Sequence, residues 1–166
     1  GGHADRLAQG RMRVDGQLNV VGRCSHLNGQ RPFGDELTGS AADDTDAKHA
    51  TGREAIRKLA GQVDVFVENF APGVAERLGL GAAELRALNP RLVYCSLSGY
   101  GQDGPYRDIK AYDLMIQGEA GMLATTGYPD QPAKVGIPIA DLATSMYAAL
   151  GIVLALFQRE TTGRGQ

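Results

Sequence analysis

Carboxylates are the side chains in this 166-residue sequence that are best placed to carry out chemistry. The sequence contains no serine elbow, no paired-histidine motif and no Cys/His cluster with metal-ligand spacing. The three histidines all lie in the first third of the chain, where each is interpreted as a surface residue. The carboxylates that remain as candidates are Glu68, Asp103, Asp108, Asp113, Glu119 and Asp141.

Asp141 stands where the hydrophobic pattern of the sequence changes. Val135, Ile137 and Ile139 alternate before it, which predicts a short buried strand, and apolar residues recur every three or four positions over 142–157, which predicts a helix. An aspartate at this junction either caps the helix or is a carboxylate positioned for chemistry. The spacing alone favours the cap.

The middle of the chain predicts an α/β fold with a parallel sheet. Residues 51–54 have the spacing of a capping box and open a helix that Gly61 ends. Apolar strands are predicted at 63–67 and 92–97, with short helices at 74–78 and 82–88 between them. Strand, helices and strand within some thirty residues indicate a right-handed βαβ unit. A further helix is expected over 112–123.

A glycine-rich loop, residues 98–105, follows the second of these strands. Ligands collect at the carboxyl ends of strands in open α/β sheets, so this loop is a candidate binding segment. It is not a phosphate loop, because it lacks the lysine–hydroxyl ending and leads into Pro105. The three aspartates at 43, 44 and 46 lack the glycine and distal glutamate of a metal loop, so no metal is expected.

Bulk composition indicates an ordinary globular chain, with 43% hydrophobic and 22% charged residues. A net charge of −2 gives no electrostatic footprint for nucleic acid. Cys95 is expected to be a reduced, buried thiol, which favours a cytoplasmic location. Residues 142–157 are short for a membrane span and contain Thr144, Ser145 and Gly151, so a buried core helix and no membrane contact are expected.

The pattern predicts an N-terminal segment followed by one domain: residues 1–47 are expected to be irregular apart from a possible strand at 18–21, and the domain covers residues 48–166. From there on, several motifs occur together and in order. They are Glu-Asn-Phe-Ala-Pro-Gly at 68–73, Arg-Leu-Gly-Leu at 77–80, Leu-Asn-Pro-Arg-Leu at 88–92, Ser-Gly-Tyr-Gly-Gln-Asp-Gly-Pro-Tyr at 98–106, Tyr-Asp at 112–113, Gly136 to Asp141, and Thr-Gly-Arg-Gly-Gln at 162–166.

In this combination the sequence resembles the family III CoA-transferases (the CaiB/BaiF family), which include formyl-CoA and carnitine CoA-transferases and α-methylacyl-CoA racemases. The resemblance covers residues 48–166 and implies the parallel-sheet, Rossmann-like core of the family's large domain, in incomplete form. The family's first strand–helix unit has no counterpart in residues 1–47, and the family continues into a second domain after the point reached here. The resemblance also implies an interlocked homodimer for a full-length member.

The resemblance further implies a role for individual residues. Asp141 matches the catalytic aspartate, which attacks an acyl-CoA thioester and passes through a mixed anhydride and an aspartyl-CoA thioester before a carboxylic acid acceptor is activated. Coenzyme A enters as the acyl-CoA substrate, and no metal is required. The residues that match coenzyme A contacts are Asn69, Phe70, Arg77, Leu78, Lys110 and Tyr112. Phe70 is expected to stack on adenine and Arg77 to pair with phosphate.

Two alternatives stay open at this stage. Racemases of the same family carry a histidine where this sequence has Tyr112, and tyrosine is a poor base at neutral pH, so a transferase is preferred. The second alternative is a non-catalytic fragment with an exposed sheet edge and an exposed apolar helix.

Overall fold

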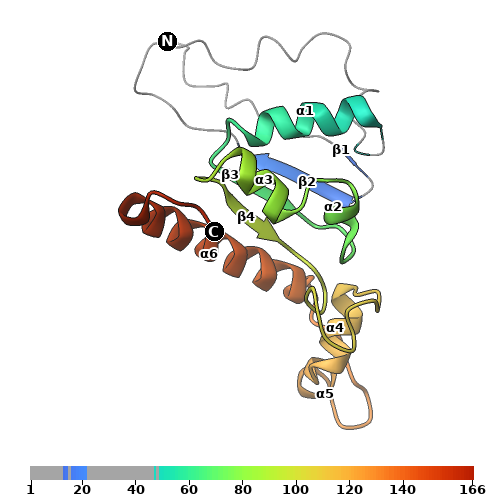
Figure 1. Cartoon of the computed structure of the whole chain (residues 1–166). Helices are drawn as coiled ribbons and strands as arrows, with labels where there is room; N and C mark the ends of the chain where they lie inside the picture. The colour runs from blue at the N-terminus through green and yellow to red at the C-terminus, as the bar shows by residue number, and fades with distance from the viewer. Residues whose placement is uncertain (1–12, 15, 22–46, 48) are drawn as a thin grey trace, which may run out of the picture.

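The computed structural model describes residues 13–14, 16–21, 47 and 49–166 (Figure 1). Four strands form one sheet in the order β1 (Arg13–Val14), β2 (Gly16–Val21), β3 (Val65–Glu68) and β4 (Val93–Ser96). β3 and β4 pair in parallel, whereas β2 runs antiparallel to β3. The predicted α/β class with a parallel strand pair is confirmed.

Residues 1–47 lie mostly outside the described residues, so the predicted domain boundary at 47/48 stays a prediction. Within that segment, β2 covers the four residues for which a strand was expected.

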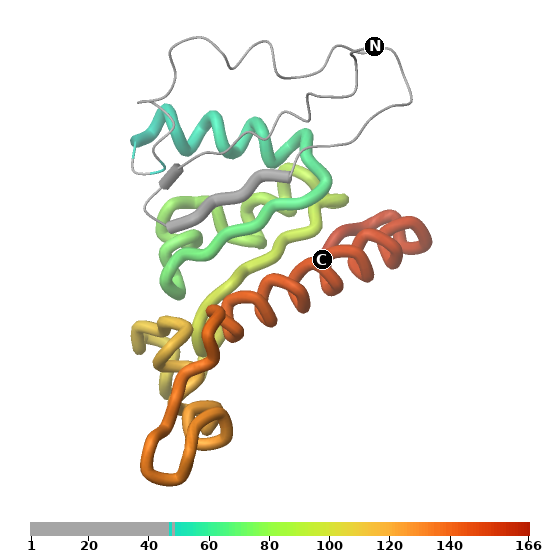
Figure 2. Tube along the Cα trace, turned by 180° about the vertical axis from the view of Figure 1, so that it is seen from behind, coloured from blue at the N-terminus to red at the C-terminus, as the bar shows by residue number. Residues whose placement is uncertain are grey.

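Six helices are present in the described part of the chain. They are α1 (Ala50–Ala60), α2 (Val74–Arg77), α3 (Ala82–Leu88), α4 (Asp113–Glu119), α5 (Met122–Thr126) and α6 (Ile139–Thr162). α1 and α3 lie on one side of the sheet and α6 runs across the other, while α4 and α5 extend beyond the carboxyl end of β4 (Figures 1 and 2).

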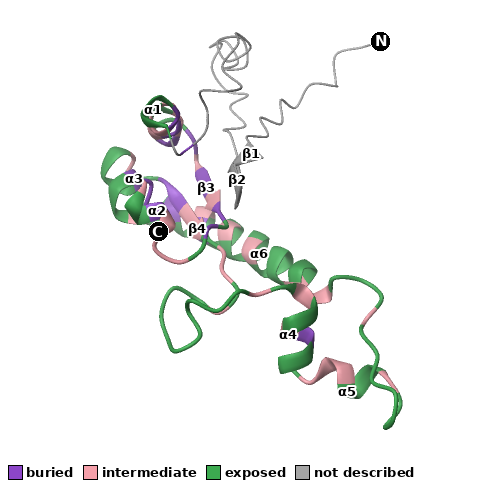
Figure 3. Cartoon of the chain, turned by 90° about the vertical axis from the view of Figure 1, so that its right-hand side faces the viewer, coloured by how far each residue is buried: buried purple, intermediate pink, exposed green. Residues whose placement is uncertain are grey.

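Successive side chains along β3 and β4 point to opposite faces of the sheet, so each strand contributes residues to both faces. Phe66 and Tyr94 point to the side of α1 and α3, where their rings stack with centroids 5.3 Å apart. Val65 and Val93 point to the other side and pack against Ala155 of α6. The larger core therefore lies between the sheet and the first three helices, and Figure 3 shows it as the buried part of the molecule.

α6 is not the buried core helix that its composition suggested. Only the narrow stripe that faces β4 is covered, and of the helix only Ala155 and Arg159 are buried. The rest is exposed, including the large apolar residues Leu142, Met146, Tyr147, Leu150, Val153, Leu154 and Phe157 (Figure 3). The expectation fails because no other described element packs on this face.

By length and composition, α6 is the one helix among the described residues that could cross a membrane, and 6% of its most apolar 18-residue stretch is buried. Core helices of soluble proteins have the same length and composition, so this finding alone does not decide between the two environments.

Three local predictions are wrong. α1 begins at Ala50 with His49 at its N-cap and no side-chain cap, so Thr51 lies inside the helix and forms no capping box. The helix expected over 112–123 is two helices, because Gly121 takes a left-handed conformation between α4 and α5. The strand expected at 135–139 is absent: Pro138 has no N–H to contribute to a sheet, and Ile137 is exposed.

The carboxyl-terminal residues return to the sheet after α6 ends at Gly163. Tyr94 in β4 donates its backbone N–H to the carbonyl of Gln166 over 2.9 Å, and Gly165 donates to the carbonyl of Pro90 over 2.9 Å. The buried Arg159 side chain pairs with Asp64 at 2.9 Å beside this return. These bonds hold the last turn of α6 against the edge of β4.

Replacement of Gly165 by alanine tests this packing. A Cβ at this position would overlap the backbone carbonyl of Leu92, so the return segment has to shift and lose its hydrogen bonds. We expect the free energy of unfolding to fall by about 1–3 kcal/mol. Urea unfolding followed by circular dichroism measures it. Gly136→Ala is the control, since no described atom lies within 4 Å of the added methyl group. Equal midpoints for the two variants would contradict the assignment.

Candidate functional site

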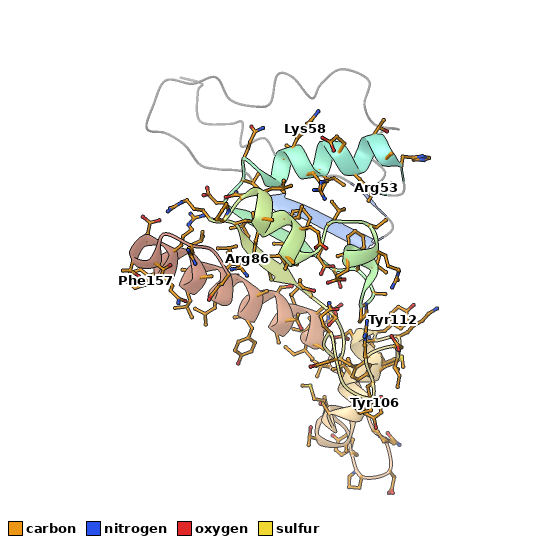
Figure 4. All side chains as sticks on the ribbon, viewed as in Figure 1. Arg53, Lys58, Arg86, Tyr106, Tyr112 and Phe157 are labelled. Atoms are coloured by element: carbon orange, nitrogen blue, oxygen red, sulfur yellow. The ribbon has the colours of Figure 1, made fainter. Side chains whose placement is uncertain are left out.

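The residues singled out in the sequence come from three segments that meet beyond the carboxyl ends of β3 and β4. The first follows β3 and leads through Gly73 into α2. The second follows β4 and runs through the glycine-rich loop to α4. The third is the first turn of α6. Leu97, just after β4, donates its backbone N–H to the carbonyl of Glu68 at the end of β3 over 2.9 Å, and Asp113 joins the second segment to the third. Figures 1 and 4 show the course of these segments.

The segment after β3 is fixed by a buried carboxylate. Glu68 is 2% exposed, and its Oε2 accepts a hydrogen bond from the backbone N–H of Phe70 over 2.7 Å. This bond closes a tight bend that leaves Asn69 exposed and turns Phe70 inward. Arg77 is exposed on α2, and Leu78 is half-buried against the core.

Phe70 belongs to the core in this structure. Its side chain is 6% exposed and lies in the cluster that includes Phe66, Leu80 and Leu92. A ring covered in this way presents no free face to a nucleotide base. Its visible role is to anchor the bend that presents Asn69.

Two side-chain hydrogen bonds hold the glycine-rich loop after β4 in place. The hydroxyl of Tyr100 donates to Oε2 of Glu119 in α4 over 2.9 Å, and this hydrogen bond raises the pKa of Tyr100 above its ordinary value. Gln102 donates to the hydroxyl of Ser96 at the end of β4 over 2.7 Å. The loop is therefore held to both the sheet and α4.

Gly99 lies directly against Ala111, so closely that a Cβ on Gly99 would overlap the Ala111 methyl group. This contact places the neighbours of Ala111, Lys110 and Tyr112, beside the start of the glycine-rich loop. Both neighbours are exposed, Tyr112 with 65% of its surface accessible (Figure 4). The contact therefore requires a residue without a side chain at position 99.

Asp113 joins the second segment to the third. Its Oδ1 accepts the backbone N–H of Ala140 in the first turn of α6 over 2.8 Å, and its Oδ2 accepts from Nε2 of Gln117 over 2.6 Å. Gln117 is 1% exposed and accepts the backbone N–H of Val135 through its Oε1 over 3.0 Å. Two side chains of α4 thus fix the chain just before and just inside α6.

Asp141 is not the N-cap of α6, which corrects the interpretation favoured by spacing. Pro138 occupies the N-cap position, Asp141 is the third residue of the helix, and it makes no side-chain cap hydrogen bond. The capping acceptor comes from Asp113 instead. The Asp141 carboxylate is exposed in the first turn of α6.

Two side chains of β4, Tyr94 and Cys95, have raised pKa values. Burial, and then the nearby Glu68 carboxylate, raise the pKa of Tyr94 well above its usual range. The same two causes raise the pKa of the half-buried, free thiol of Cys95. A cavity of about 280 Å³ lies beside Cys95 between β4 and α6, and it contains none of the residues predicted for the site.

Among the described residues, no three His, Cys, Asp or Glu side chains lie close enough to hold a metal ion. The aspartates at 43, 44 and 46 and the histidines at 3 and 26 lie outside the described residues. The absence of a metal therefore stays a prediction.

Sequence reasoning missed the roles of Glu68, Asp113 and Gln117. All three act through hydrogen bonds to backbone groups, two of which are more than fifteen residues away, and local spacing does not predict such bonds. The sequence alone indicates Asp113 only as a candidate carboxylate within the Tyr-Asp motif at 112–113.

Comparison with known proteins places these residues in context. The sequence pattern of CoA-transferase family III matches residues 44–166. A formyl-CoA:oxalate CoA-transferase of Streptomyces avermitilis is 46% identical over 120 residues, which are 72% of this chain and 29% of that protein. A succinate–glutarate CoA-transferase of Agrobacterium fabrum is 42% identical over 122 residues, 73% of this chain and 30% of that protein.

Solved structures give the same picture. A CaiB/BaiF family protein from Brucella suis is 43% identical and superposes with a TM-score of 0.71 over 73% of this chain and 32% of its own. A Mycobacterium tuberculosis protein is 34% identical, with a TM-score of 0.68 over 73% of this chain and 34% of its own. The chain thus spans about 30% of the length of the relatives it matches.

Gly99→Ala tests the contact that places Lys110 and Tyr112. The new methyl group and that of Ala111 cannot share the space, so we expect the backbone amide resonances of residues 110–112 to shift and the melting temperature to fall. Adding Ala111→Gly to the same chain removes the second methyl group and should restore both. A double variant as perturbed as Gly99→Ala alone would contradict the contact.

Asp113→Ala tests the link between α4 and α6. The N–H of Ala140 and the amide of the buried Gln117 lose their acceptors, so we expect a loss of about 1–3 kcal/mol of stability. Hydrogen exchange at the Ala140 amide should accelerate. Asp130→Ala removes an exposed carboxylate with no bond to any described residue and serves as the control. Unchanged protection at Ala140 in Asp113→Ala would refute the link.

Proposed function

Because the chain belongs to CoA-transferase family III, we propose that it transfers coenzyme A from an acyl-CoA donor to a carboxylic acid, with Asp141 as the nucleophile. The observation that carries the proposal is the placement of Asp141. It is an exposed carboxylate in the first turn of a long helix, and another residue, Asp113, fixes that turn. Its oxygens are therefore not used for capping and are available to a ligand.

The proposed reaction balances without an external energy source. An oxygen of Asp141 attacks the thioester carbonyl carbon, the C–S bond breaks, and a mixed anhydride and the CoA thiolate result. The thiolate attacks the aspartyl carbonyl, which releases the donor acid and leaves an aspartyl-CoA thioester. An oxygen of the acceptor carboxylate then attacks the aspartyl thioester carbonyl, the C–S bond breaks, and a second mixed anhydride and the CoA thiolate result. The thiolate attacks the acceptor carbonyl of this anhydride, which releases the Asp141 carboxylate and gives the new acyl-CoA. Each intermediate keeps an activated acyl group, so no ATP is consumed.

Coenzyme A is proposed to lie along the edge formed by the loops after β3 and β4. Asn69 and Leu78 would contact the nucleotide, Arg77 would pair with phosphate, and Lys110 and Tyr112 would lie nearer the thioester. These side chains, except the half-buried Leu78, are exposed. The backbone bond from Leu97 to Glu68 joins the first of their segments to the second, and Asp113 joins the second to the third. Phe70 is proposed to support the bend at Asn69 from within the core.

The acceptor is proposed to be a small carboxylic acid. The relatives are named for formyl-CoA and oxalate, for succinate and glutarate, and for succinyl-CoA and citramalate, so short dicarboxylic acids are the first acceptors to test. No metal, nucleic acid or membrane takes part in this proposal, and the location is the cytoplasm, where a free thiol such as Cys95 stays reduced.

An interlocked homodimer is proposed for the full-length protein. The support in this chain is the apolar face of α6, which is exposed over most of its length and has the composition of a buried surface.

Two other outcomes are distinguished by experiment. An α-epimerase would exchange the α-hydrogen of a branched acyl-CoA for deuterium without any acceptor acid, and Tyr112 argues against it. A non-catalytic chain would show neither activity, and the exposed face of α6 favours this outcome for the isolated chain.

Asp141→Asn tests the nucleophile. Since neither the cap nor the core depends on Asp141, stability should change by no more than about 0.5 kcal/mol. An amide cannot form the anhydride, so turnover should fall by roughly a thousandfold or more. Chromatography measures the acyl-CoA formed from succinyl-CoA with glutarate and from formyl-CoA with oxalate. In the wild type, hydroxylamine trapping followed by mass spectrometry should label Asp141.

Asp130→Asn is the matched control for this variant, because it makes the same change at an exposed turn. An active Asp141→Asn variant, or a hydroxylamine label on another residue, would overturn the assignment. A folded wild-type chain without turnover would count against catalysis by this chain alone.

A further inference from the structure

Two arginine side chains from different loops converge on one glycine. A Cβ placed on Gly73 would lie 3.0 Å from Nη1 of Arg77 and 3.1 Å from Nη2 of Arg107. Arg77 lies on α2 just after Gly73, whereas Arg107 lies at the end of the glycine-rich loop, thirty residues further along the chain. The two guanidinium groups therefore flank the same small volume.

Both guanidinium groups can approach residue 73 because it has no side chain. Gly73 has a φ of +75°, a conformation that other residues rarely adopt, and any side chain there would contact both guanidinium groups. The glycine thus accounts for the turn into α2 and for the close approach of both arginines.

The charges around this volume are unbalanced. No ion pair joins Arg77 to a carboxylate among the described residues. Arg107 approaches Asp108 through Nε at 3.8 Å, but the Asp108 side chain is 90% exposed, so the pair is weak and leaves Nη2 free to face Gly73. Two neighbouring positive charges repel each other, and an anion bound between them removes that repulsion.

The hydrogen-bond donors of two guanidinium groups favour a phosphate group as the bound anion. Guanidinium groups offer several N–H donors in a planar fork that matches the oxygens of a phosphate, and two such forks can share one phosphate group. The location agrees, because Gly73 lies on the loop that follows β3, and Arg107 lies on the segment that follows β4, which also carries Lys110 and Tyr112.

We propose that Arg107 and Arg77 together bind a single phosphate group, and, resting on the proposed function, that this group belongs to coenzyme A. Arg107 is then a binding residue of the nucleotide portion. No phosphate motif surrounds it in the sequence, and only the contact with Gly73 identifies it.

Calorimetric titration of coenzyme A into the full chain tests the proposal. Arg107→Gln should raise the dissociation constant by about tenfold or more, as loss of a charge-assisted bond to phosphate does. Arg77→Gln should have a similar effect. The double variant should bind less weakly than the product of the two effects predicts, because both arginines hold the same group. Lys58→Gln removes one exposed positive charge on α1, distant from the site in Figure 4, and should change affinity less than twofold.

Two further titrants complete the test. Dephospho-coenzyme A lacks the 3′-phosphate: if Arg107→Gln weakens it as much as coenzyme A, the pair holds the diphosphate, and if Arg107 no longer matters, it holds the 3′-phosphate. Pyrophosphate tests the pair without the proposed function. If the wild type binds pyrophosphate through both arginines but not coenzyme A, the proposed function fails and the anion site stands. If Arg107→Gln binds coenzyme A and pyrophosphate as the wild type does, with unchanged circular dichroism, the inference is overturned.

Discussion

The parallel pairing of β3 with β4 is the constraint on which the candidate site depends. The register runs from Val65 opposite Val93 to Glu68 opposite Ser96, so both strands end at the same level of the sheet. The loops that follow therefore start side by side, although some thirty residues separate them in the sequence. The buried Glu68 carboxylate lies at this shared end, where it holds the bend at Phe70. Burial, and then this carboxylate, raise the pKa of Tyr94 and Cys95 in β4. Shifting the register by one residue would exchange the two faces of the sheet and separate these loops.

Sequence reasoning succeeded where the signal is local. α3 was predicted over the residues it occupies, and β3 and β4 lie within or one residue beyond their predicted runs, because short apolar stretches bounded by glycine and proline specify both. It failed at 135–139, where alternation is present but the N–H of Val135 bonds to the Gln117 side chain instead of another strand. It failed again at Asp141, since the hydrogen-bond acceptor for α6 comes from Asp113, twenty-seven residues away. Bonds of this range cannot be read from spacing.

For the candidate site, the family resemblance indicates which residues to consider, and the structure shows which contacts join the segments that carry them. Asp141, Lys110 and Tyr112 were each predicted separately, and the contacts of Asp113 and Gly99 show that one set of loops carries them all. The structure also separates residues that resemblance had grouped. Phe70 is buried in the core while its neighbour Asn69 is exposed, so only Asn69 of this pair is accessible to a ligand. Arg107 is identified only by its position beside Gly73 in the structure.

The exposed face of α6 bears directly on the chemistry of Asp141. A carboxylate surrounded by water is a weak nucleophile, and partial desolvation is needed for attack on a thioester. Leu142 and Met146, which follow Asp141 on the first two turns, are exposed and apolar. A surface that packed on these residues would bury apolar area, which is favourable, and would at the same time remove water from Asp141, which alone is not. If Asp141 is the nucleophile, as proposed, the stabilisation gained along α6 can offset its desolvation, so that covering the helix also activates the carboxylate.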